Sequence, residues 1–136
     1  MSPLMPIDSP RTTCMIGAIL VKVIEMYVTI NHIPVADGRE TDFEALWHSR
    51  EGSIEGQPGF VSLDILKPGM KMTHGGPPEK QDNTYHVMTR WESEEAFLRW
   101  VGSEDFRRAH DRKVDKTIYG GPALVTMHAT IEGAGA

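Results

Sequence analysis

Asn31, Trp100 and His110 are the residues of this chain whose types and positions suggest chemistry. A neutral imidazole binds a metal ion or accepts a proton, and an indole ring presents a large flat apolar surface. Asn31 lies inside an apolar, strand-like run, where a buried amide without a partner costs about 1–3 kcal/mol. Its position therefore favours a site. Taken singly, Trp100 is more typical of a hydrophobic core, and His110 of a packed, hydrogen-bonded histidine.

Several other kinds of site are not indicated. The other five histidines are scattered, and no pair has the H-x-x-x-H spacing of a zinc site; they are His32, His48, His74, His86 and His128. No glycine-rich phosphate loop follows a strand, and there is no G-x-S-x-G motif. Four basic residues lie close together, and such a group is more often a solvated helix face than an anion site: Arg107, Arg108, Arg112 and Lys113.

Composition narrows the class of protein. The chain has 136 residues and a net charge of -5, which argues against a nucleic-acid binder. Cys14 is the only cysteine, so an intramolecular disulfide is impossible, and a reducing cytoplasm is the expected location. Lys22 and Glu25 interrupt the apolar N-terminal run, so no membrane span is expected there. No basic segment of a signal peptide precedes that run.

The elements that must position these residues follow from local patterns. Strands are predicted at 26–35, 60–66, 84–91 and 123–131, and a helix at 42–50 with an apolar stripe. Ser93 is a predicted N-cap for a helix that contains Trp100, and Ser103 for a second helix that ends near His110. Phe106 shares the apolar side of that helix with His110. Residues 67–83 are rich in glycine and proline and predict a long mobile hairpin loop.

The order strand, helix, strand, strand, helix, strand predicts an α+β, ferredoxin-like fold with the helices on one face of an antiparallel sheet. The first strand is apolar on both faces. The face without helices therefore predicts a homodimer, a dimeric α/β-barrel made by packing sheet on sheet. The domain is expected at 26–132, with a flexible tail at 133–136. Residues 1–25 form an extension, in which 1–14 are predicted to be a disordered tail and 16–24 an extra strand.

Four segments carry a resemblance to a known family: "TINHIPV", the "PGF" turn, "TRWESEEAFLRW" and "SEDFRRAH". Over roughly residues 26–131 the chain resembles the antibiotic-biosynthesis monooxygenases. More narrowly, it resembles the IsdG-type heme-degrading monooxygenases, because Asn31, Trp100 and His110 match their three functional residues. The chain departs from these proteins in its extension of about 25 residues and in its long loop after the second strand.

This resemblance implies a function and roles for residues. His110 would bind the heme iron, Asn31 would donate a hydrogen bond to iron-bound oxygen, and Trp100 would press on the macrocycle and distort it. Phe106 and Arg50 are further expected heme contacts. Heme would be substrate and cofactor at once. It would be opened with O2 and with electrons from an external reductase, and iron would be released.

Two alternatives stay open from the sequence. The first is a cofactor-independent monooxygenase that acts on an aromatic polyphenol or quinol, in which Asn31 binds the ring and His110 is a base or a structural residue. The second is a non-catalytic heme-binding protein that uses the same pocket. Heme binding is expected of the heme-degrading enzyme and of the heme-binding protein, but not of the cofactor-independent monooxygenase. Turnover of heme with a reductant then separates the enzyme from the binding protein.

Overall fold

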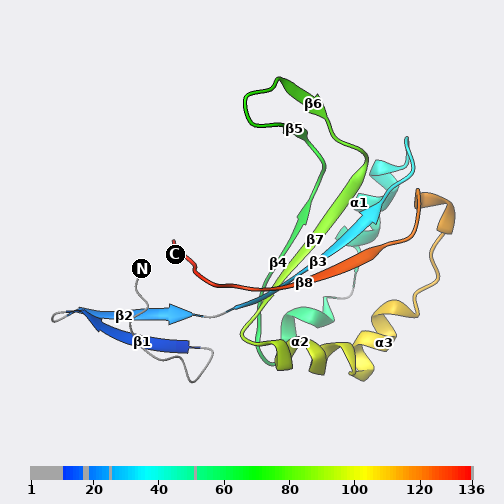
Figure 1. The fold of residues 1–136 in the computed structure, drawn as a ribbon. Coiled ribbons are helices and arrows are strands. Elements are labelled where there is room, and N and C mark those ends of the chain that lie inside the picture. Colours follow the sequence, from blue (N-terminus) through cyan, green and yellow to red (C-terminus); the bar gives the residue numbers. More distant parts are fainter. Residues whose placement is uncertain (1–10, 17–18, 25, 51, 136) are drawn as a thin grey trace.

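The computed structural model describes residues 26–50 and 52–135 and the strands at 11–16 and 19–24. A four-stranded antiparallel sheet has the order β4-β7-β3-β8 (Figure 1). Its strands are β3 (Tyr27–Pro34), β4 (Phe60–Leu66), β7 (Thr84–Trp91) and β8 (Leu124–Ala129). The helices are α1 (Glu40–His48), α2 (Glu94–Val101) and α3 (Glu104–His110). This order confirms the predicted α+β, ferredoxin-like fold.

Smaller elements complete the chain. Short 3-10 helices are η1 (Ser53–Gly56) and η2 (Lys116–Ile118). The predicted loop at 67–83 contains a short antiparallel hairpin, β5 (Met70–Met72) with β6 (Pro78–Lys80). Near the N-terminus, β1 (Arg11–Ile16) pairs with β2 (Ile19–Ile24). Residues 11–14, which were expected to belong to a disordered tail, thus lie in a strand. The remainder of that predicted tail, residues 1–10, lies outside the described residues.

One face of the sheet is covered by the helices. Alternate residues of β7 are buried, as expected where one side of a strand faces a core: Tyr85, Val87, Thr89 and Trp91. One cluster joins the sheet to α1 and η2 through residues including Phe43 and Ile118. A second cluster joins Trp91 to Ala96 and Trp100 of α2. The apolar stripe predicted for the helix at 42–50 is the side of α1 that packs in the first cluster.

The other face of the sheet is mixed in character. The register places apolar side chains on it, Val28 and Ile30 of β3 with Leu66, Met88 and Leu124 of the other strands, but polar residues stand beside them. These are His32, Ser62, Asp64, His86, Arg90, Thr126 and His128. The face is therefore less apolar than the sequence of the first strand predicted. The homodimer through this face stays a prediction.

Both predicted serine caps are present. The Ser93 hydroxyl accepts a hydrogen bond from the Ala96 backbone N–H at 3.1 Å, and the Ser103 hydroxyl accepts one from the Phe106 N–H at 3.0 Å. Each cap satisfies one of the free N–H groups of a helix start, and acidic residues follow in each first turn. The two caps fix where α2 and α3 begin, and so place Trp100 in the last turn of one helix and His110 in the last turn of the next.

Gly59, in the turn before β4, allows α2 to approach the sheet. Its φ is +83°, and a Cβ at this position would lie 2.5 Å from the Ala96 Cβ. Gly59→Ala is therefore expected to lower the free energy of unfolding by about 2–4 kcal/mol, from backbone strain and overpacking together. Gly38 is a matched control, because its φ is +86° and a Cβ there meets nothing within 4 Å. Gly38→Ala should cost only about 1 kcal/mol. Urea denaturation measures both, and equal losses would contradict a role for the Ala96 contact.

Arg39 joins the start of α1 to η2. Its guanidinium donates to Asp42 at 2.7 Å, to the Thr117 hydroxyl at 2.8 Å and to Asp115 at 3.2 Å. Hydrogen bonds from the Thr117 hydroxyl and backbone N–H, and then from Arg39, lower the pKa of Asp115 to about 2. The contact contributes to stability only while Asp115 is ionised.

Acid should therefore weaken this contact. Because the folded-state pKa of Asp115 is depressed below its ordinary 3.8, its contribution is present above that value and is lost as the pH falls toward 2. Denaturation of the wild type and of Asp115→Asn at several pH values measures this. The variant is expected to be the less stable at pH 5, and the difference should shrink by pH 2. A difference that stays constant with pH would exclude the ionised carboxylate as its cause.

Candidate functional site

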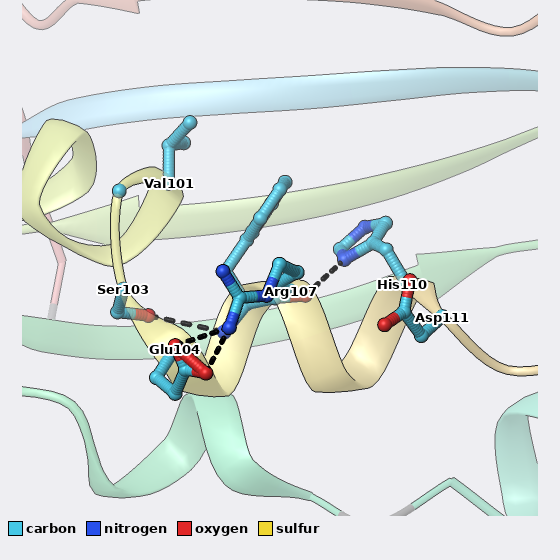
Figure 2. Close-up of a pocket in the computed structure, with 8 residues that line it drawn as sticks. Val101, Ser103, Glu104, Arg107, His110 and Asp111 are labelled. Carbon is cyan, nitrogen blue, oxygen red and sulfur yellow. Dashed lines mark hydrogen bonds and ion pairs between the residues drawn. The ribbon is translucent and has the colours of Figure 1, made fainter.

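A shallow pocket lies along α3 and the end of α2 (Figure 2). Its volume is about 350 Å³, and it is open to solvent. The side chains of Val101 and His110 extend to the same side of the two helices, whereas Glu104 lies on the other side of α3 (Figure 2). The lining residues are Val101, Gly102, Ser103, Glu104, Phe106, Arg107, His110 and Asp111. Two of the predicted site residues, Phe106 and His110, therefore line one pocket.

His110 is held in one ring orientation by its own helix. Its Nδ1 lies 2.8 Å from the backbone carbonyl oxygen of Phe106, and its ring stacks on the Phe106 ring with centroids 4.0 Å apart. A carbonyl oxygen only accepts hydrogen bonds, so Nδ1 must carry the proton in this contact. In the neutral ring the lone pair then resides on Nε2. Metal-ligating histidines usually donate their other ring N–H to a carboxylate, a carbonyl or water, and His110 meets this condition. Its side chain is exposed.

Trp100 is buried, and it directly precedes Val101, which lines the pocket. It is 6% exposed and packs with Trp91 and Ala96. Its ring meets the Phe106 ring edge-on, with centroids 5.3 Å apart. Trp100, Phe106 and His110 thus form a continuous row of rings from the core to the pocket. Trp100 is not among the residues that line the pocket, so its predicted contact with a macrocycle stays a prediction.

Asn31 lies on the helix-covered face of the sheet. It lies two residues from each of the buried residues Thr29 and Ile33, so the three side chains are on the same face of β3. Its Oδ1 is buried and has no hydrogen-bond partner among the described residues. The orientation of an asparagine amide is assigned from its partners, so either the oxygen or the NH2 group can occupy this position. An unsatisfied buried amide costs about 1–3 kcal/mol and is the strongest local sign that a ligand group belongs here.

The sheet beside Asn31 is only partly covered. Asn31 pairs with Val125 of β8, and Val125 and Met127 lie on the same face of the sheet as Asn31. These two apolar side chains are 48% and 53% exposed. α2 and α3 cover this face at Trp91 but leave it exposed at β8. Apolar surface therefore flanks Asn31, as a flat apolar ligand would need.

Arg50 is engaged away from the pocket. It forms an ion pair with Glu55 at 2.5 Å and donates to the Trp47 backbone carbonyl at 3.0 Å. Its guanidinium also lies 5.7 Å from the centroid of the Trp47 ring. These partners hold Arg50 at the junction of α1 and η1, and it is absent from the pocket lining. A role for Arg50 in binding a ligand stays a prediction.

Arg107 is a pocket residue that the sequence did not single out as a site residue. It lies one helical turn before Asp111 and forms an ion pair with Glu104. The run of basic residues along α3 was its only signal, and that pattern is more typical of a solvated face.

No helix in the described part of the chain is long and apolar enough to cross a membrane.

Comparison with known proteins decides the family. Residues 26–112, more than half of the chain, match the family model "Antibiotic biosynthesis monooxygenase". The chain belongs to this family. The matched region contains Asn31, Trp100 and His110, and the resemblance inferred from "TRWESEEAFLRW" and the neighbouring segments is confirmed.

Several relatives of this chain are heme-degrading enzymes. A mycobilin-producing heme oxygenase of Mycobacterium tuberculosis is 34% identical over 74 residues, which are 54% of this chain and 61% of that protein. A heme-degrading monooxygenase of Listeria monocytogenes is 40% identical over 47 residues, which are 35% of this chain and 39% of that protein. The matches thus span less than two thirds of the length of these relatives.

Solved structures give the same picture over a longer stretch. The heme degrader MhuD of M. tuberculosis, with two hemes bound in its active site, is 28% identical with a TM-score of 0.63. That comparison covers 80% of this chain and 99% of MhuD. SnoaB of Streptomyces nogalater, a cofactor-independent oxygenase, is 17% identical with a TM-score of 0.55, over 79% of this chain and 95% of SnoaB. The likeness to SnoaB shows a shared fold alone.

Proposed function

We propose that this chain is a heme-degrading monooxygenase in which His110 binds the heme iron. The observation that carries the proposal is the geometry of His110. The Phe106 carbonyl fixes its tautomer, and its Nε2 carries the free lone pair beside a pocket. The similarity to heme-degrading relatives supports the choice of ligand.

The residues present fit heme. His110 would supply a nitrogen ligand for the iron, and the stacked Phe106 ring would limit rotation of the imidazole. The unpartnered amide of Asn31 would gain a hydrogen-bond partner on the ligand. The exposed Val125 and Met127 side chains would cover apolar macrocycle edge and exclude water from it. Trp100, backed by Trp91, would give the ligand a rigid surface to press against.

Bound heme would supply both the iron that reacts with O2 and the ring that is oxidised, with electrons from an external donor. Asn31 suits such a site because an amide orients a reacting group without offering a titratable proton. Nδ1 of His110 would remain hydrogen-bonded to Phe106 throughout, which keeps Nε2 directed to the iron. Release of iron, a cytoplasmic location and a partner reductase belong to this proposal.

Titration of the purified, heme-free protein with hemin tests the function. A saturable Soret band at one equivalent is expected, and ascorbate in air with catalase present should then bleach it and release iron that a ferrous chelator detects. A stable Soret band without bleaching would leave a heme-binding protein. Failure to form any stoichiometric complex would remove the proposal and turn the search to aromatic quinols as substrates of a cofactor-independent enzyme.

A further inference from the structure

The pocket beside His110 contains one cationic side chain. Among the described residues that line it, Arg107 is the only arginine or lysine, and its side chain is 67% exposed. Arg107 forms an ion pair with Glu104, three residues earlier on α3, and Figure 2 shows its guanidinium turned toward that carboxylate. The pocket therefore holds a positive charge whose present partner is another exposed side chain.

The tertiary structure separates Arg107 from its basic neighbours in the sequence. Arg108 forms an ion pair with Asp105, and Arg112 donates a hydrogen bond to the Leu46 carbonyl oxygen of α1 at 3.2 Å. None of the other basic residues of this segment lines the pocket: Arg108, Arg112 and Lys113. An anionic group in the pocket would therefore meet Arg107 rather than a general basic surface.

The present partner of Arg107 can be exchanged at little cost. The side chains of Arg107 and Glu104 are 67% and 62% exposed, and water and salt screen an ion pair in such a place. A carboxylate on a ligand that covers the pocket would be shielded from part of this water. The planar guanidinium forms two parallel hydrogen bonds to a carboxylate, and this pairing is stronger where water is excluded. The released Glu104 would return to solvent.

We propose that Arg107 binds an ionised carboxylate of a porphyrin held at His110, and that it makes the pocket selective for porphyrins with free carboxylates, such as the propionates of heme. The inference rests on the proposed function, in which His110 binds the iron. Residues three apart on a helix are neighbours on its surface, so a ligand at His110 lies within reach of the flexible Arg107 side chain. Arg107 thereby determines specificity and takes no part in oxidation of the ring.

Titration with hemin and with hemin dimethyl ester, followed in the Soret region, tests this role. The ester has the same iron and ring but no ionised carboxylate. Arg107→Gln is expected to bind hemin about three- to tenfold more weakly than the wild type, and to bind the ester equally well. Glu104→Gln removes the competing carboxylate and should bind hemin more tightly than the wild type. Both residues are exposed and glutamine is a good helix former, so the fold should persist.

Arg108→Gln is the matched control. Arg108 is also exposed and also pairs with an acidic residue three positions earlier, but it does not line the pocket, so hemin binding should be unchanged. If Arg107→Gln binds hemin as Arg108→Gln does, or loses affinity for hemin and the ester alike, the inference is overturned. A saturable Soret complex that depends on His110 would still support the proposed function in that case. A wild type that forms no stoichiometric hemin complex would overturn both.

Discussion

His110→Ala is expected to weaken heme binding at least about tenfold, which corresponds to about 1.4 kcal/mol. The wild-type ring presents Nε2 to the pocket because its Nδ1–H is fixed on the Phe106 carbonyl, and alanine offers no replacement ligand. The Soret band of the imidazole complex should shift and weaken in the variant. Hemin titration followed by absorbance measures the effect.

The matched control for this experiment is His48→Ala. His48 is also exposed and also ends a helix, α1, but it does not line the pocket. Its removal should leave the Soret band and the affinity unchanged. Addition of free imidazole should restore the spectrum of His110→Ala if the loss is one of ligation. A His110→Ala protein that binds heme with the wild-type spectrum would show that another residue holds the iron.

Trp100→Ala is expected to lower the free energy of unfolding by about 3–5 kcal/mol. The ring is 6% exposed, packs with Trp91 and Ala96, and meets Phe106 edge-on at 5.3 Å. Its loss would leave a cavity between α2 and the sheet. Trp47→Ala is the comparison, since Trp47 is only partly buried, and it should cost less, about 1–2 kcal/mol. Urea denaturation measures the free energy of unfolding of both variants. A smaller loss in Trp100→Ala than in Trp47→Ala would contradict the prediction.

This structural role affects how activity data on Trp100 are interpreted. A loss of turnover in Trp100→Ala would not identify a functional residue, because the pocket depends on the same ring for support. Trp100→Phe retains an aromatic ring in the cluster and separates the two roles. If Trp100 distorts bound heme, this variant should form the Soret complex but degrade heme at least about tenfold more slowly. Equal rates would leave Trp100 as a core residue.

Local sequence patterns determined most of the fold. The residue types of β7 and the serines before α2 and α3 act over a few residues, so they predicted Thr84–Trp91 and both caps. The contact between His110 and the Phe106 carbonyl is also local, four residues apart on one helix. The hairpin of β5 and β6 was missed as secondary structure, because strands of three residues are too short to show a periodic pattern.

Contacts between distant segments required the tertiary structure. His32 and Thr126 are separated by 94 residues, and they meet only because β8 pairs beside β3 in one particular register. A shift of that register by one residue would turn His128 and Thr126 to the other face of the sheet. The burial of Trp100 likewise depends on how α2 packs on the sheet at Trp91. The sequence alone determined which residues could do chemistry, and strand pairing and packing decided which of them lie together.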